Sequence, residues 1–70
     1  MASNQLIMDS YETKVQSLQS SMKAREYDLA DIKYLGLEGW LEGLLTGDAI
    51  TSNEYLEMSR RVDKIYFRMK

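Results

Sequence analysis

Cysteine and histidine are both absent from this 70-residue chain. The chain therefore has no disulfide, no thiol nucleophile, no imidazole base and none of the usual zinc ligands. A chain of this length buries only about 60% of the surface that its unfolded form exposes, so its stability as a monomer is expected to be marginal. With disulfides and zinc excluded, we expect a protein partner or self-association, as a homodimer or higher oligomer, to supply the missing stability.

Proline is absent as well, and the four glycines all lie between Gly36 and Gly47. Because nothing in the chain alternates with period two, the pattern predicts helices joined by short turns and no strands. No apolar run approaches the ~20 residues of a membrane span, and the N-terminus lacks the regions of a secretory signal. We therefore expect a soluble, cytoplasmic protein without membrane contact. At 44% hydrophobic and 29% charged residues, the chain is too apolar to be disordered.

The net charge of −2 conceals an uneven distribution. Between residues 29 and 57, Lys33 is the one basic residue among the acidic side chains of Asp31, Glu38, Glu42, Asp48, Glu54 and Glu57. Between residues 58 and 70, Asp63 is the one acidic residue among the basic side chains of Arg60, Arg61, Lys64, Arg68 and Lys70. Such a division is typical of a nucleic-acid contact or a charged partner, but it also fits charges that complement a helix dipole.

The first predicted helix covers residues 4–25. Its apolar residues step by three, four, three and four, which is a heptad seam formed by Met8, Tyr11, Val15, Leu18 and Met22. The seam is about two heptads long, shorter than a self-sufficient coiled coil, so the helix needs another element to pack against.

The second predicted helix covers residues 28–46, with Asp28 as its N-cap. Its apolar face is unusually wide and is formed by Leu29, Ile32, Leu37, Trp40, Leu41, Leu44 and Leu45. We therefore expect this helix to be the central element, with Trp40 in the core. The glycines Gly36, Gly39 and Gly43 allow two interpretations: a groove for the close approach of another helix, or a break between two shorter helices.

The third predicted helix covers residues 51–69 and carries the second heptad seam, formed by Tyr55, Met58, Val62, Ile65 and Met69. Gly47 is expected to end the preceding helix in the left-handed conformation. Thr51 and Glu54 have the spacing of a capping box, and Ile50 and Tyr55 that of a hydrophobic staple. The sequence thus predicts one all-α domain, residues 1–70, folded as a small bundle of three helices and oligomeric.

The segment 41–58, LEGLLTGDAITSNEYLEM, resembles the SHOCT-type domain, a short helical hairpin at the ends of many bacterial and phage proteins. The shared pattern consists of Leu41, Leu44, Leu45, Gly47, Ile50, Thr51, Glu54 and Tyr55. The resemblance implies a small helical element for oligomerisation or interaction without enzymatic activity. Short chains of this composition are also frequent among phage and prophage proteins.

No catalytic, cofactor-binding or metal-binding constellation is visible in the sequence. Glu38 and Glu42 are one turn apart, but two carboxylates fall short of a calcium site and are typical of a solvated helix face. The segment GDAITSNEY lacks the spacing of an EF-hand loop, and GLEGWLEG lacks that of a phosphate-binding loop. We therefore expect a protein that is not an enzyme and that binds no cofactor.

Two binding functions fit the sequence. The first is a protein-interaction module, a small regulator or inhibitor that docks on a larger protein through Tyr66 and Phe67, which cannot both point along one core seam. The second, ranked lower, is nucleic-acid binding through the last helix, in which aromatic rings stack on bases and the phosphates contact Arg60, Arg61, Lys64 and Arg68. A self-assembling structural protein is the remaining alternative.

Overall fold

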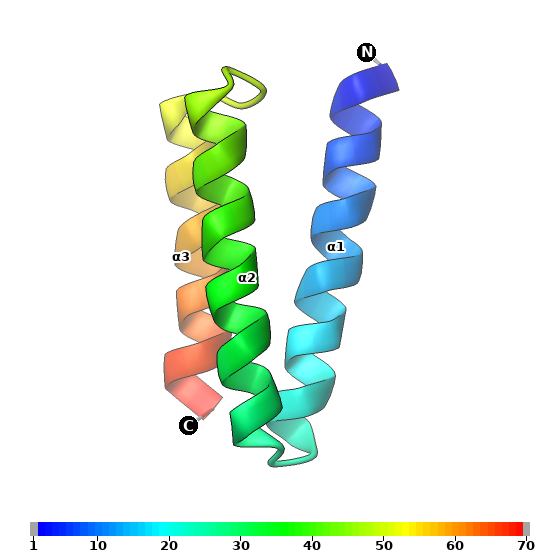
Figure 1. The fold of residues 1–70 in the computed structure, drawn as a ribbon, viewed down its shortest axis with the longest axis vertical. Coiled ribbons are helices and arrows are strands. Elements are labelled where there is room, and N and C mark those ends of the chain that lie inside the picture. Colours follow the sequence, from blue (N-terminus) through cyan, green and yellow to red (C-terminus); the bar gives the residue numbers. More distant parts are fainter. Residues whose placement is uncertain (1, 70) are drawn as a thin grey trace.

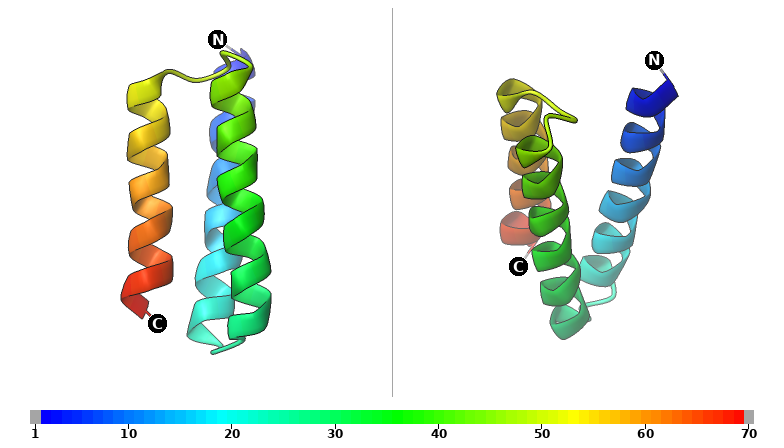
Figure 2. Two further views of the ribbon diagram at one scale, coloured as in Figure 1. Left: turned by 60° about the vertical axis from the view of Figure 1, so that its left-hand side comes forward. Right: turned by 45° about the horizontal axis from the view of Figure 1, so that its top comes forward.

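The computed structural model describes the backbone of residues 2–69 and the side chains of residues 5–68. It contains three helices, α1 (Ala2–Lys23), α2 (Tyr27–Thr46) and α3 (Ser52–Met69), and no strand within the described range. In Figure 1 the helices run down, up and down, so that the start of α1 and the α2–α3 turn lie at one end of the molecule. Each helix contacts the other two, and α2 and α3 stand side by side with α1 packed against both (Figure 2). The prediction of a small all-α bundle is confirmed.

The core is formed by one face of each helix. Its buried side chains are Tyr11, Val15, Leu18 and Met22 of α1; Ala30, Leu37 and Leu41 of α2; Ile50 of the turn; and Met58, Val62 and Tyr66 of α3. The seam predicted for α1 is confirmed except at Met8, which is 42% exposed near the free end of the helix. In the seam of α3, Met58 and Val62 are buried and Tyr55 and Ile65 are half-buried; the side chain of Met69 lies outside the described residues.

The wide apolar face of α2 is only partly used. Leu37 and Leu41 are buried and Trp40 is half-buried against the core, but Leu29 is 43% and Ile32 is 68% exposed, so their predicted place in the core is wrong. The reason is geometric, because α1 and α3 together cover one side of α2 and leave the opposite side to solvent. A helix that is apolar nearly all round cannot bury every such residue against two neighbours.

The helix α2 is continuous through its glycines, as one of the two interpretations predicted. A Cβ atom added at Gly36, Gly39 or Gly43 would meet no atom within 4 Å, so no helix of this chain approaches them. The glycine groove is therefore wrong as an account of packing within the chain. None of the helices in the described range is both long enough and apolar enough to cross a membrane.

In both inter-helix turns the second residue is in the left-handed conformation and is not glycine. Arg25 has a φ of 58° and Asp48 a φ of 61°, whereas Gly47 has a φ of −84°, so its predicted left-handed conformation is wrong. At the end of α2, the Asp48 N–H donates to the Leu45 carbonyl at 3.1 Å and the Ala49 N–H to the Leu44 carbonyl at 2.8 Å. This is the Schellman pattern, with Asp48 one residue beyond the expected position.

The two later helices begin differently. Before α3, the Thr51 N–H donates to the Glu54 carboxylate at 2.8 Å, and the Glu54 N–H donates to the Thr51 hydroxyl at 3.1 Å. Before α2, Glu26 occupies the N-cap position and makes no side-chain capping hydrogen bond. Asp28 lies in the first turn of α2 and is not its cap, which corrects the prediction.

Candidate interaction face

Three polar contacts fix how α2 and α3 lie against each other. The Tyr34 hydroxyl donates to the Asp63 carboxylate at 2.7 Å, and the Ser59 hydroxyl donates to Glu38 at 3.4 Å. In the third contact, the Tyr66 hydroxyl donates to Asp31, one helical turn from the Tyr34–Asp63 contact and two turns from the Ser59–Glu38 contact. The two helices are antiparallel, so each contact marks a pair of residues at the same height in the bundle. These contacts hold the two helices in one defined register.

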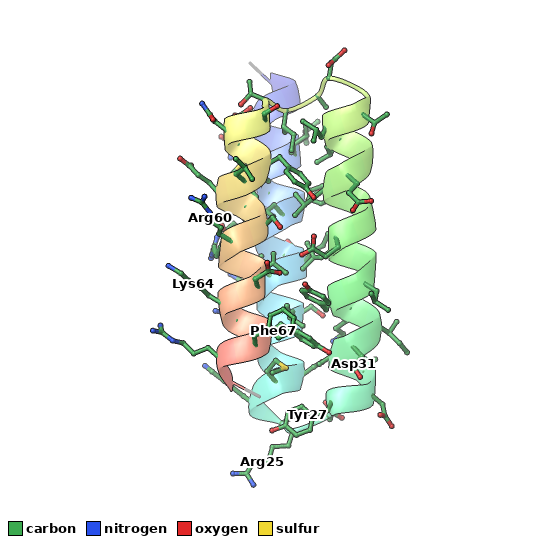
Figure 3. All side chains as sticks on the ribbon, turned by 90° about the vertical axis from the view of Figure 1, so that its left-hand side faces the viewer. Arg25, Tyr27, Asp31, Arg60, Lys64 and Phe67 are labelled. Carbon is green, nitrogen blue, oxygen red and sulfur yellow. The ribbon has the colours of Figure 1, made fainter. Side chains whose placement is uncertain are left out.

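Three aromatic rings pack together where the first half of α2 lies against the end of α3. The rings of Tyr34 and Tyr66 stack with their centroids 4.2 Å apart, and Phe67 meets both edge-on at 5.6 and 4.9 Å. Tyr66 is only 7% exposed, so its predicted exposure is wrong. Its spacing of four from Val62 places it on the core face of α3, a signal that the sequence contained. Phe67 is 62% exposed, as predicted, and lies in front of the two helices (Figure 3).

The carboxyl groups between α2 and α3 share a partly buried environment. Burial, followed by the neighbouring Asp63 carboxylate as hydrogen-bond partner and as charge, raises the pKa of Glu38. Burial and the hydrogen bond to Asp63 also raise the pKa of the Tyr34 hydroxyl. Glu38 therefore holds a proton at a higher pH in the folded protein than in the unfolded chain.

Replacing Glu38 with glutamine should raise the free energy of unfolding at neutral pH and weaken its pH dependence. A carboxyl group whose pKa is raised by folding stabilises the fold below its unfolded pKa, and this stabilisation is lost as pH rises through the folded pKa. Urea unfolding at about pH 4 and pH 7 measures the effect, which should be larger at pH 7. Glu26→Gln is the control and should change neither value, because Glu26 is exposed and makes no side-chain capping hydrogen bond; an equal response of both variants would contradict the prediction.

The basic residues of α3 divide into two groups. Arg60, Lys64 and Arg68 are exposed and recur every fourth residue, so they form one row along α3. In Figure 3 the labelled Arg60 and Lys64 extend away from α2. Arg61 instead reaches α1, so the structure does not place it with the other predicted partner-binding residues.

Arg61 links α3 to α1. Its guanidinium donates two hydrogen bonds to the Glu12 carboxylate, one of them at 3.0 Å, and lies 5.5 Å from the centre of the Tyr11 ring. These hydrogen bonds from Arg61 lower the pKa of Glu12. The Tyr11 hydroxyl donates to the buried carbonyl of Met58 at 2.9 Å, which adds a second polar contact between the same helices. Arg61 is therefore a structural residue of the α1–α3 contact.

The face formed by α2 and α3 on the side away from α1 combines apolar and charged side chains. We call it the α2–α3 face and define it by its exposed residues Asp28, Leu35, Glu42, Leu56, Arg60, Lys64 and Phe67. Steps of seven residues place Asp28, Leu35 and Glu42 in one line along α2, and the same step joins Arg60 to Phe67 on α3. The α2 edge of this face is acidic, its α3 edge is basic, and Leu35 and Phe67 are the most exposed of its apolar side chains.

A concavity lies between α1 and α2. It has a volume of about 260 Å³ and is lined by Lys14, Ser17, Lys33, Gly36 and Leu37. The Lys33 ammonium donates to the Ser21 hydroxyl at 2.7 Å and to the Ser17 carbonyl at 3.2 Å, so it serves the contact between the two helices. Lys14 lies 5.3 Å from the centre of the Trp40 ring. The lining offers no nucleophile paired with a base, and the described residues contain no cluster of three metal-ligating side chains.

Comparisons with models of protein families, with curated proteins and with solved structures find no match to this chain. The resemblance of residues 41–58 to a SHOCT-type hairpin therefore stays a prediction. The functional argument depends on the geometry and chemistry of the α2–α3 face.

Proposed function

We propose that this chain is a non-enzymatic protein-interaction module, a small regulator that binds a protein partner through the α2–α3 face. The observation that carries the proposal is the large apolar surface that α2 and α3 leave in solvent. Three large apolar side chains of the face are exposed: Leu35 at 68%, Leu56 at 46% and Phe67 at 62%. Exposed apolar side chains edged by charges are typical of a protein-binding site.

The chemistry of the face supports binding over catalysis. Phe67 is held against the stacked rings of Tyr34 and Tyr66, so little side-chain freedom remains to be lost when a partner covers it. Aromatic and leucine side chains provide apolar area at about 25 cal/mol per Å² buried, while charges at the rim orient the partner. Because a cysteine-free chain fits a reducing compartment, the proposed setting is the cytoplasm.

An affinity pull-down from source-cell lysate tests this proposal when it is repeated with matched variants. The wild type should retain one protein at near-stoichiometric yield with and without nuclease. Leu35→Asp combined with Phe67→Asp should lose that protein, because charges replace the centre of the face. The control is Leu6→Asp on α1, where leucine is 68% exposed, as Leu35 is. Equal recovery by both variants would place the partner elsewhere on the molecule.

One observation favours a second candidate function, nucleic-acid binding. Arg60, Lys64 and Arg68 form a continuous exposed row beside an exposed aromatic ring, Phe67, as phosphate contact and base stacking require. For this candidate, recovery in the pull-down disappears with nuclease. Three phosphate contacts to a single strand would also weaken binding about 20-fold between 50 and 200 mM salt.

A further inference from the structure

We propose that the partner of the α2–α3 face is a second copy of this chain, with α2 of each protomer packed against α3 of the other about a two-fold axis parallel to the helices. This inference rests on the proposed function and names the partner. Three independent features carry it: unpaired charge of opposite sign on the two edges of the face, the register between α2 and α3, and the area that a stable dimer requires.

The opposite charges of the face do not neutralise one another within the protomer. Between described side chains, the one ion pair joins Arg61 to Glu12, and neither residue belongs to the face. The carboxylates of Asp28 and Glu42 are exposed on α2, and the basic row is exposed on α3, where its labelled members extend away from α2 (Figure 3). The basic residue of α2, Lys33, is directed to α1. The α2 edge therefore presents carboxylates, and the α3 edge presents three basic side chains with Glu57 as its one exposed carboxylate between residues 55 and 68.

The register of α2 against α3 places these charges at matching heights. Moving along α2 by a given number of residues moves the contact back along α3 by the same number, as expected of straight antiparallel helices. This holds for the three contacts Asp31–Tyr66, Tyr34–Asp63 and Glu38–Ser59. By the same relation Asp28 is level with the turn of α3 that contains Arg68. Arg60 is level with the stretch of α2 between Leu35 and Glu42.

The direction of the two-fold axis decides which charges of the two copies meet. A two-fold axis parallel to the helices places α2 over α3 of the second copy and keeps every height unchanged. Asp28 then faces the turn that contains Arg68 of the second copy, and Glu42 lies within one to two turns of Arg60 of the second copy. An axis across the helices would instead place α2 on α2 and set carboxylates against carboxylates, which repel. The charges thus select the parallel axis.

The width of the face matches the area that a dimer needs. A stable interface buries about 800 Å² per partner. That is roughly one-sixth of the 4836 Å² of accessible surface, and a face two helices wide can supply it. In the proposed dimer Leu35, Leu56 and Phe67 leave solvent at its centre, while the paired charges form its rim. A contact through the glycines of α2 alone would be one helix wide and would leave Phe67 and Leu56 exposed.

Sedimentation of charge-reversed variants tests the proposal. The wild type should be dimeric across a dilution series. A variant with Asp28→Lys and Glu42→Lys carries two basic edges, and a variant with Arg60→Glu, Lys64→Glu and Arg68→Glu carries two acidic edges. Each variant alone should be monomeric through repulsion between like edges, and an equimolar mixture should form a heterodimer because every edge again meets its opposite. All five positions are exposed, and helical circular dichroism checks that each variant is folded.

A wild type that stays monomeric at every concentration would overturn the inference, and so would a mixture of folded variants that remains monomeric. Dimers of either variant alone would also contradict it, because they would place the contact outside the face. The pull-down separates this result from the proposed function. If the wild type is monomeric but loses a captured protein through Leu35→Asp and Phe67→Asp, the face binds another protein and only the second copy is excluded. If both experiments fail, the face itself is wrong.

Discussion

Replacing Leu41 with aspartate should abolish the cooperative unfolding of this protein. Leu41 is fully buried in the cluster to which all three helices contribute. Truncating a buried leucine costs about 2–5 kcal/mol, and burying a carboxylate without a partner adds several kcal/mol. A 70-residue domain has a total stability of only about 4–10 kcal/mol, so the substitution removes most or all of it.

Thermal unfolding followed by circular dichroism measures this effect, and the same helix provides the control. Leu35→Asp makes the same chemical change at a position that is 68% exposed, and it should keep a cooperative transition. A sharp transition of Leu41→Asp at the wild-type temperature would show that the core has been placed wrongly. Loss of the transition in both variants would show that α2 is buried on its outer side as well.

Replacing Gly36 and Gly43 together with alanine should raise the free energy of unfolding by about 2 kcal/mol. Both glycines lie inside α2, where glycine costs up to about 1 kcal/mol relative to alanine because the unfolded chain has more conformational freedom to lose. The added methyl groups meet nothing within 4 Å, so no strain opposes the gain. For a chain of this size the midpoint temperature should rise by about 10 °C.

Denaturant unfolding of a dilute sample measures this gain, with Gly47→Ala as the control. Gly47 follows the last residue of α2, and a Cβ atom there would lie 3.3 Å from the Gly43 carbonyl oxygen. We therefore expect little or no gain from this variant. An unchanged stability of the Gly36 and Gly43 variant would mean that another chain contacts these glycines in solution.

The periodic parts of the sequence predicted the fold well. The steps of three and four in α1 and α3 identified Tyr11, Val15, Leu18, Met58 and Val62 as core residues, and all are buried. Every helix boundary falls within two residues of its prediction. These predictions succeeded because one face of each of these helices is apolar and the other polar, so the pattern itself distinguishes the buried side.

The pattern could not distinguish the sides of α2. Leucine and isoleucine occur nearly all round this helix, so the residues that face α1 and α3 are decided by packing, and Ile32 and Leu35 remain in solvent. The left-handed residue after α2 was also displaced by one position. Glycine is the usual residue there, but Asp48 adopts the conformation because a short polar side chain tolerates it.

The candidate face was predicted in part. The basic row of Arg60, Lys64 and Arg68 and the exposure of Phe67 follow from charge and helical spacing. The separate role of Arg61 does not, because it depends on Glu12, which is 49 residues away and comes close only when α1 packs on α3. Leu35 was missed for the same reason, since exposure is a property of the packed helices.

Residue-resolved nuclear magnetic resonance tests the central claim, that this chain acts through the α2–α3 face, most directly. Amide spectra of the isotope-labelled protein would be recorded on dilution and with any protein captured in the pull-down. The largest changes should fall on the lines Asp28–Leu35–Glu42 of α2 and Leu56–Arg60–Phe67 of α3. Changes concentrated on the outer side of α1, around Leu6 and Thr13, would contradict it.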